Sequence, residues 1–189
     1  MTYGIVVVGA SLGGLRAMSE LLAAIPEEVD LPVVLAQHRA PDSERDALEA
    51  LLRRHTRRVV VEAGDKEAIQ AQHVYVAPPD YHLLVEEEGS FALSTDERVQ
   101  FARPSVDVLF ESAADAYGER TIGIVLTGAN ADGAAGLRAI RDVGGVAIVQ
   151  DPETAEARQM PDAAMLATAA DAILPVGEMG KFLLGLCLR

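Results

Sequence analysis

The stretch Ile5-Val6-Val7-Val8-Gly9-Ala10-Ser11-Leu12-Gly13-Gly14 decides the fold of this chain. The β-branched run at residues 5–8 predicts a buried strand, and the glycines that follow predict a tight turn. Apolar residues then recur at helical spacing, at Leu15, Met18, Leu21, Leu22 and Ile25. A strand, a turn and an amphipathic helix in this order begin an α/β fold.

The same unit recurs along the chain. Further short apolar strands are predicted at residues 31–36, 59–61, 122–126, 146–149 and 172–174. Segments with helical spacing separate them, including one that carries Leu48, Leu51 and Leu52. Ser43 is the expected N-cap of that helix. Later helices are predicted to begin near Pro104, to carry Leu137 and Ile140, and to lie near residues 161–169, and another closes the chain.

The middle of the chain has a different character. Residues 73–76 precede Pro78-Pro79-Asp80, and two short apolar runs follow at residues 82–85 and 91–93. The polar stretch Glu86-Glu87-Glu88-Gly89-Ser90 between these runs predicts an antiparallel hairpin.

These patterns predict a doubly wound α/β fold, a Rossmann-like three-layer sandwich. Its mostly parallel sheet carries helices on both faces and an attached antiparallel β-hairpin. The 189 residues, half of them hydrophobic, suit one domain over 1–189 with a sizeable core.

Composition excludes several classes of function. The 16 basic and 29 acidic residues give a net charge of −13, which repels nucleic acid. No apolar run approaches the length of a membrane span, so we expect a cytoplasmic protein that is not inserted in a membrane. The one cysteine, Cys187, stands in an apolar run and is interpreted as a packed thiol without chemistry.

Ligand sites in parallel sheets lie at the carboxyl ends of the strands, so the residues there are the candidates. Ser11 follows the first strand in a turn close to the G-x-S-x-G nucleophile elbow, beside the N–H groups of a helix N-terminus. A simpler interpretation is that Ser11 only caps the helix. A dinucleotide-binding turn is disfavoured because the G-x-G-x-x-G spacing is absent.

His38 and Asp132 follow two other strands. His38 stands directly after the second strand, within reach of Ser11 in a doubly wound sheet, and is the natural general base. Asp132 lies in the glycine-rich segment after residues 122–126 and is placed to orient the His38 imidazole. Each also has an ordinary interpretation, His38 as a surface residue and Asp132 as a helix N-cap.

Other polar residues carry weaker signals. No metal-ligand spacing of His, Cys and Asp is present. The basic run at residues 53–58 is interpreted as a solvated helix end. Ser105 or Asp107 is expected to cap the helix that follows Pro104.

Six blocks of the sequence together resemble the catalytic domain of the chemotaxis protein-glutamate methylesterases, the CheB family, over nearly the whole chain. They are Gly9-Ala10-Ser11-Leu12-Gly13-Gly14, Gln37-His38, His73-Val74-Tyr75-Val76-Ala77-Pro78, Arg103-Pro104-Ser105-Val106-Asp107, Leu126-Thr127-Gly128 and Asp132-Gly133-Ala134-Ala135-Gly136.

The resemblance implies a serine esterase with Ser11 as nucleophile, His38 as general base and acid, and Asp132 as the orienting carboxylate. The implied substrates are glutamyl γ-methyl esters on the cytoplasmic helices of methyl-accepting chemoreceptors, with methanol as product. Deamidation of receptor glutamines is the second implied activity. No cofactor is implied.

The chain departs from the family pattern at three places. Leu12 stands where the family usually has Thr, Ala129 where it usually has Met, and Gln159-Met160-Pro161 only partly keeps a Gly-Met-Pro element. Family members usually carry an N-terminal receiver domain, whereas the first strand here begins almost at Met1. We therefore expect a chain without a receiver, either constitutively open or controlled by a separate protein. A catalytically silent module that binds receptor helices is the alternative hypothesis.

Overall fold

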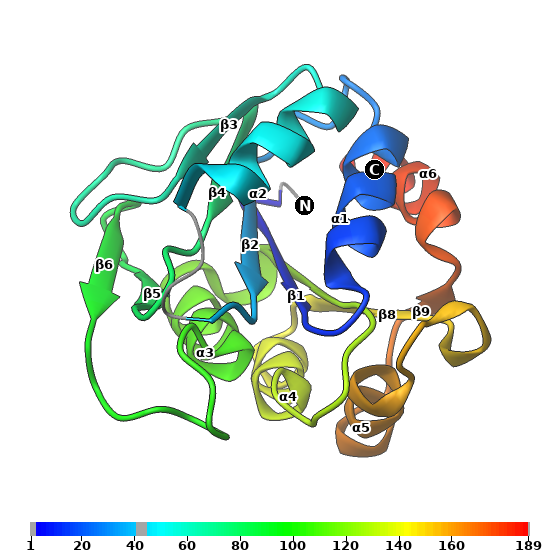
Figure 1. Cartoon of the computed structure of the whole chain (residues 1–189). Coiled ribbons are helices and arrows are strands. Elements are labelled where there is room, and N and C mark those ends of the chain that lie inside the picture. The colour runs from blue at the N-terminus through cyan, green and yellow to red at the C-terminus, as the bar shows by residue number, and fades with distance from the viewer. Residues whose placement is uncertain (1–2, 41–44, 189) are drawn as a thin grey trace.

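The computed structural model describes residues 3–40 and 45–188, and Figure 1 shows how their elements are arranged. Its main sheet has seven strands in the order β3-β4-β2-β1-β7-β8-β9, all paired in parallel. These strands are β1 (Ile5–Ala10), β2 (Val33–Gln37), β3 (Val59–Glu62), β4 (His73–Val76), β7 (Thr121–Val125), β8 (Val146–Gln150) and β9 (Ala172–Leu174). The predicted parallel sheet is confirmed.

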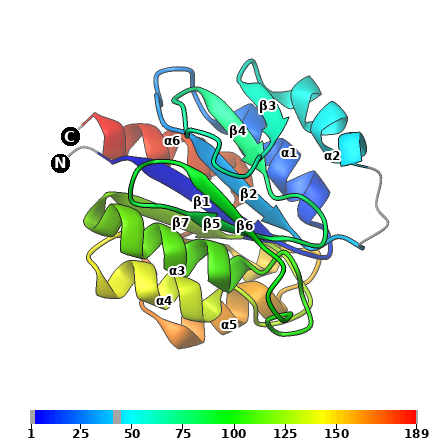
Figure 2. The same cartoon turned by 90° about the vertical axis from the view of Figure 1, so that its left-hand side faces the viewer.

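Helices cover both faces of this sheet, as Figure 2 shows. One layer contains α1 (Gly14–Ala24), α2 (Arg45–Leu52) and α6 (Val176–Cys187). The other contains α3 (Val106–Tyr117), α4 (Ala134–Asp142) and α5 (Gln159–Ala167). Short 3-10 turns occur at η1 (Arg53–His55), η2 (Gly118–Arg120) and η3 (Pro152–Thr154). The doubly wound three-layer sandwich expected from the sequence is therefore present.

The middle of the chain divides between two sheets. The predicted hairpin is β5 (His82–Val85) paired antiparallel with β6 (Phe91–Ser94), and Leu83 and Phe91 pack into the core beside α3. The preceding β4, which the sequence grouped with this region, instead joins the main sheet between β3 and β2. Its four residues have no helix directly before or after them, so the alternation of strands and helices did not reveal its place.

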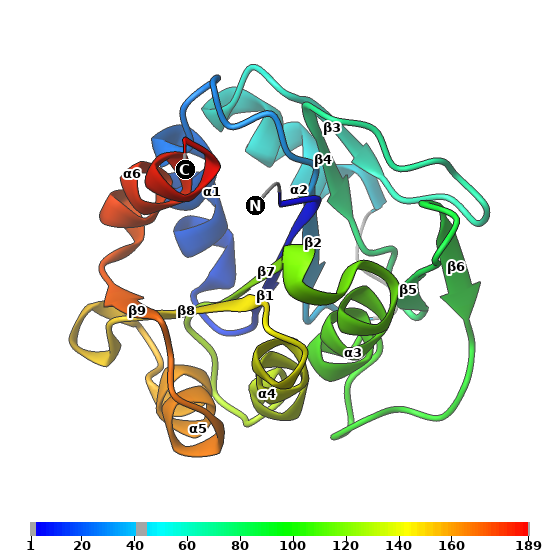
Figure 3. The same ribbon diagram turned by 180° about the vertical axis from the view of Figure 1, so that it is seen from behind.

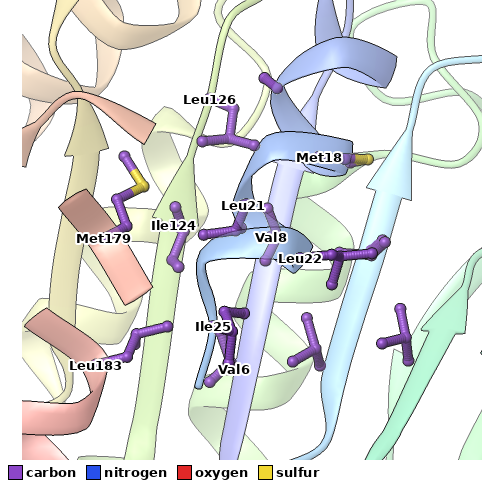
Figure 4. Close-up of a cluster of buried hydrophobic side chains, with 14 of the residues drawn as sticks. Val6, Val8, Met18, Leu21, Leu22, Ile25, Ile124, Leu126, Met179 and Leu183 are labelled. Carbon is purple, nitrogen blue, oxygen red and sulfur yellow. The ribbon is translucent and has the colours of Figure 1, made fainter. Parts of the chain in front are cut away.

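Alternating side chains of β1 build the two halves of the core. Val6 and Val8 pack against α1 and α6, whereas Ile5 and Val7 pack on the opposite face against α3 and α4. All six residues of β1 are buried, which is why the strand is a continuous apolar run. Figure 4 shows the first half, in which Met18, Leu21 and Leu22 of α1 and Ile25, the residue after α1, lie over β1. Met179 and Leu183 of α6 lie beside them.

The basic segment at residues 53–58 is not uniformly solvated, which corrects the interpretation from sequence. Arg57 is exposed and pairs with Glu27 at 2.6 Å. Arg58 is buried, and its guanidinium donates to the backbone carbonyls of Leu31 and Val29. Arg58 thus satisfies the carbonyl groups of the segment that leads into β2, a structural role invisible in a run of like charges.

Two other expectations concern single residues. Ser43, the expected N-cap of α2, lies outside the described residues. Cys187 is half-buried near the end of α6, and burial raises the pKa of its thiol, which favours the unreactive protonated form. None of the helices in residues 3–40 and 45–188 combines the length and the apolar character that a bilayer span needs.

The core assignment predicts that Leu21→Ala lowers the free energy of unfolding by about 2–5 kcal/mol, because it leaves a cavity between β1 and α1. Leu166→Ala on α5 is the matched control, since this leucine is 89% exposed on another helix. Its effect should stay within about 0.5 kcal/mol. Urea unfolding of both variants checks the prediction, and equal losses would contradict the assignment of the core.

Candidate active site

The carboxyl ends of β1, β2 and β7 meet at one edge of the sheet. Ala10 of β1 is paired with Gln37 of β2, and the His38 N–H donates to Ala10 O at 3.2 Å. On the other side, Gly9 is paired with Val125 of β7. The strand order reverses between β1 and β7, and open α/β sheets bind ligands at such a switch point. The segments that contain Ser11, His38 and Asp132 therefore converge there.

Ser11 lies in the turn between β1 and α1, and both of its backbone groups are held. Its N–H donates to Thr127 O at 3.0 Å, and its carbonyl accepts from Gln37 Nε2 at 2.8 Å. The N-cap of α1 is Gly13, in a left-handed conformation with φ of +78°, and no side chain caps the helix. Among the described residues, no hydrogen bond engages the Ser11 hydroxyl, so Ser11 does not act as a cap.

On its other side, this turn lies close to the segment after β7, which contains Gly128. At Gly128, which follows β7, an added Cβ would collide with Met160 Sδ and lie 2.9 Å from Ser11 Cβ. The Met160 N–H also donates to Gly128 O at 2.9 Å. Glycine is therefore required at 128, and the segment after β7 passes directly beside the serine.

His38 and Asp132 form a short hydrogen bond. His38 Nε2 lies 2.7 Å from Asp132 Oδ2. The carboxylate is completely buried, whereas the imidazole keeps 14% of its side-chain surface exposed. The polar partner of His38 is thus inaccessible to water, while the ring itself reaches the surface beside Ser11.

Asp132 is surrounded by donors. Its Oδ2 also accepts from the Val106 N–H at 2.7 Å, and its Oδ1 accepts from Ser105 Oγ at 2.8 Å and the Asp107 N–H at 2.9 Å. Burial by itself would raise its pKa, but the bond from His38 and the backbone N–H groups outweigh burial and hold the pKa of Asp132 below its ordinary value. The carboxylate is ionised and accepts only, so the proton of the shared bond sits on His38 Nε2.

Helices α3 and α4 lie side by side in Figure 3 and have crossed caps: an aspartate near the start of each helix accepts from N–H groups at the start of the other. Asp132 precedes α4 yet accepts from N–H groups at the start of α3. Asp107 belongs to α3, and its Oδ1 accepts from the N–H groups of Gly133 and Gly136 at 2.8 Å each. The alternative interpretation, in which Asp132 only caps its own helix, is therefore wrong. Ser105 is confirmed as the N-cap of α3, through its bond from the Val108 N–H.

The two buried aspartates have opposite environments. Burial raises the pKa of Asp107, and the nearby negative charge of Asp132 adds to this, although N–H groups of Gly136 and Gly133 act against it. Asp132 instead has His38 as a partner that bears positive charge when protonated. Of the two carboxylates, Asp132, which faces His38, is therefore the one whose ionised form is favoured more strongly.

Asn130 is a polar residue of this site that the sequence reasoning missed. Its Nδ2 lies 3.1 Å from His38 Nδ1, and its Oδ1 accepts from the Asp132 N–H at 3.2 Å. The available signal was its position in the glycine-rich segment after β7, two residues before Asp132. Gln37 was overlooked in the same way, although it adjoins His38 and holds the Ser11 carbonyl.

A groove of about 890 Å³ opens beside Ser11 and runs along α1. Leu12, Leu15 and Leu51 give it apolar walls, and Leu12 is 55% exposed at its mouth. Glu20 and Glu156 add negative charge to its lining. Among the side chains that the structure describes, in residues 3–40 and 47–188, no group of three or more His, Cys, Asp or Glu residues is arranged to hold a metal ion.

The family model described as CheB methylesterase matches residues 6–183. The chain belongs to the CheB methylesterase family.

Relatives and a solved structure agree with this membership. A Leptospira interrogans protein with the provisional name protein-glutamate methylesterase/protein-glutamine glutaminase is 43% identical, over 98% of this chain and 96% of its own length. Protein-glutamate methylesterase FrzG of Myxococcus xanthus is 37% identical over 96% of this chain, which spans 54% of that protein. The crystal structure of the Thermotoga maritima CheB methylesterase catalytic domain superposes with a TM-score of 0.92 at 32% identity, covering 98% of this chain and all of that one.

The departures from the CheB pattern lie at the surface of the site. Leu12 and Ala129 are both exposed, while the Leu12 carbonyl accepts from Thr127 Oγ1 at 2.9 Å. Met160 is buried and keeps its bond to Gly128. In this member of the CheB family, the departure at Leu12 therefore changes a wall of the groove, and the backbone bonds of Ser11 to Thr127 and Gln37 stay in place.

The crossed caps generate a prediction about stability and pH. Asp132→Asn replaces one of two accepting oxygens by an NH₂ group, which then faces hydrogen-bond donors. We therefore expect the free energy of unfolding to fall by about 1–3 kcal/mol at neutral pH. Because the folded pKa of Asp132 is depressed, its contribution is complete above the unfolded value of about 3.9 and is lost as the pH falls below it. The difference between wild type and variant should therefore shrink in urea titrations at about pH 3.

Asp107→Asn is the matched control. A single asparagine oxygen still accepts from both Gly133 and Gly136, and the substitution removes a charge that burial disfavours. The other oxygen, Oδ2, accepts from Gln100 Nε2 at 2.9 Å, and the exposed Gln100 amide can turn over to accept from the new NH₂. Its cost at neutral pH should stay within about 1 kcal/mol. Equal losses for the two variants would show that the two carboxylates do not differ as described.

Proposed function

We propose that this chain is a serine esterase that hydrolyses glutamyl γ-methyl esters on the cytoplasmic helices of methyl-accepting chemoreceptors. The observation that carries the proposal is the 2.7 Å bond between His38 Nε2 and buried Asp132, formed beside Ser11 in a chain of the CheB methylesterase family. The names of the Leptospira and Myxococcus relatives support the same reaction. In this proposal Ser11 is the nucleophile, His38 the base and acid, and Asp132 the orienting carboxylate.

The first half of the reaction acylates the serine. Ser11 Oγ attacks the ester carbonyl carbon while its proton passes to His38 Nδ1, the nitrogen not bound to Asp132. The charge of Asp132 stabilises the imidazolium that forms. The backbone N–H of Leu12, which makes no backbone hydrogen bond among the described residues, is the donor offered to the developing oxyanion. Collapse of the intermediate breaks the bond to methoxide, which leaves as methanol with the proton from Nδ1.

The second half regenerates the enzyme. Water gives a proton to His38 Nδ1 and attacks the acyl carbon, and the tetrahedral intermediate then releases Ser11 Oγ, which recovers the proton. The products are glutamate and free enzyme. A glutamine side chain enters the same sequence with ammonia in place of methanol, which is the deamidase activity contained in the Leptospira relative's name. The sequence of steps uses no cofactor.

The groove favours this substrate over its product. A methyl ester is neutral and matches the apolar walls formed by Leu12, Leu15 and Leu51. The glutamate product carries a negative charge into a groove lined by two carboxylates, Glu20 and Glu156, and one guanidinium, Arg16, in a protein of net charge −13. Hydrolysis therefore weakens binding at this site and promotes release.

The proposal includes the setting of the reaction. The chemoreceptor helices are the partner, the compartment is the cytoplasm, and a separate regulatory protein is the means of control.

The test measures methanol released from methylated receptor signalling domains of the same organism. Ser11→Ala should reduce the rate by at least about 10³-fold, because it removes the nucleophile. The thermal midpoint should not change, because the hydrogen bonds of Ser11 come from its backbone, which the substitution keeps.

Ser90→Ala on the β5–β6 hairpin is the matched serine control and should retain wild-type turnover, since the Ser90 hydroxyl donates to Glu86 Oε2 on the same hairpin. Unchanged turnover in Ser11→Ala would contradict the serine mechanism. Receptor binding by wild type and Ser11→Ala, with no methanol from either, would favour the silent binding module.

A further inference from the structure

We propose that Asn130 is a positioning residue that occupies the base nitrogen of His38 in the resting protein and must leave it before Ser11 is activated. This inference rests on the proposed function and adds a restraint to the same site. It is argued from three features: the orientation of the Asn130 amide, the bond of His38 Nε2 to Asp132, and the half-buried position of Asn130 between exposed neighbours.

The orientation of the amide is fixed by its oxygen. Asn130 Oδ1 accepts from the Asp132 N–H at 3.2 Å. The other end of the amide, Nδ2, therefore faces His38 Nδ1 at 3.1 Å. An amide NH₂ only donates, so Asn130 approaches Nδ1 as a hydrogen-bond donor.

His38 is able to accept this bond because of Asp132. The ionised, buried carboxylate keeps the ring proton on Nε2, which leaves a lone pair on Nδ1. Asn130 and Asp132 thus select the same tautomer from opposite sides of the ring. His38 is held in the form that a general base needs.

The same bond also opposes catalysis. An imidazole nitrogen has one lone pair, and Ser11 needs that lone pair to hand over its hydroxyl proton. While Asn130 donates to Nδ1, Ser11 has no hydrogen-bonded base, which agrees with the lack of any bond from its hydroxyl among the described residues. After proton transfer, an N–H on Nδ1 would face the NH₂ of Asn130, so the imidazolium also requires that amide to move.

The surroundings of Asn130 allow this movement. The residue is half-buried, and its chain neighbours Ala129 and Ala131 are both exposed. The amide therefore has solvent to turn into, while Asp132 stays anchored by its bonds to the start of α3. Activation of Ser11 needs a side-chain rotation at 130 and no change in the backbone.

Two substitutions separate this restraint from a structural role. Asn130→Ser keeps an oxygen that accepts from the Asp132 N–H, but its side chain is too short to reach His38. Asn130→Asp keeps the shape and the accepting oxygen but turns an acceptor toward Nδ1, which favours a proton on that nitrogen. A structural role predicts loss in both variants, whereas the restraint predicts opposite effects.

The readout is covalent labelling of the whole chain by a fluorophosphonate. Ser11 Oγ forms a bond to phosphorus, fluoride leaves with the P–F electron pair, and the hydroxyl proton passes to His38 Nδ1. At neutral pH, Asn130→Ser should label roughly two- to tenfold faster than wild type, the factor that one ordinary hydrogen bond contributes. Asn130→Asp should label more slowly than wild type. Ser11→Ala should not be labelled, and this control shows that the label attaches to Ser11.

The ¹⁵N NMR resonance of His38 Nδ1, assigned by difference from His38→Gln, reports the bond directly. It should move downfield in Asn130→Ser, because the lone pair loses its donor. Equal or slower labelling of Asn130→Ser, or an unchanged resonance, would overturn the inference while leaving the esterase proposal standing. If wild type itself fails to label, the esterase proposal fails, and the resonance alone decides whether Asn130 occupies Nδ1.

Discussion

The exchange of caps between α3 and α4 is the constraint on which the site depends. Asp132 accepts from the first N–H groups of α3, and Asp107 accepts from those of α4. Each helix start is positive in character, so each stabilises a carboxylate that burial would otherwise disfavour. Because each helix holds the residue that satisfies the other, the two helix starts are fixed relative to one another. Asp132 is thereby fixed relative to His38.

This arrangement gives one side chain two functions. Asp132 needs its donors for the stability of the fold, and those donors also keep it ionised for His38. Two adjacent buried carboxylates repel each other, and the structure resolves the conflict by unequal environments, with the pKa lowered at Asp132 and raised at Asp107. The charge lies where an imidazolium would form, so the electrostatics are in place before a substrate arrives.

The parallel sheet supplies the remaining geometry. Register between β1 and β2 sets His38 beside Ser11, and the crossover through α3 returns the chain to β7 on the other side of β1. The backbone of Ser11 is clamped by Thr127 and Gln37 while its hydroxyl stays free. The fixed backbone keeps the serine in place, and its hydroxyl can become a nucleophile once it hydrogen-bonds to His38 Nδ1. Asn130 adds a restraint on the base, in a loop that has room to release it.

Ser11, His38 and Asp132 could be named as candidates from the sequence because each follows an apolar strand, and the ends of parallel strands meet at one edge whatever the details of packing. Strand periodicity likewise predicted the layers and the hairpin. The sequence missed the place of β4, the burial of Arg58 and the contact of Asn130 with His38. Each of these depends on a partner distant in the chain, so no local pattern reports it.

The sequence by itself therefore determined the α/β class, the family and the three strand-end residues, since periodicity and motif spacing are local properties of the chain. Only the tertiary structure decided which atoms meet: that Asp132 caps the neighbouring helix instead of its own, and that His38 turns Nε2 to Asp132 and Nδ1 to Asn130. The physical reason is that hydrogen bonding and burial are set by groups brought together through packing. A side chain's protonation and partners follow from that packing.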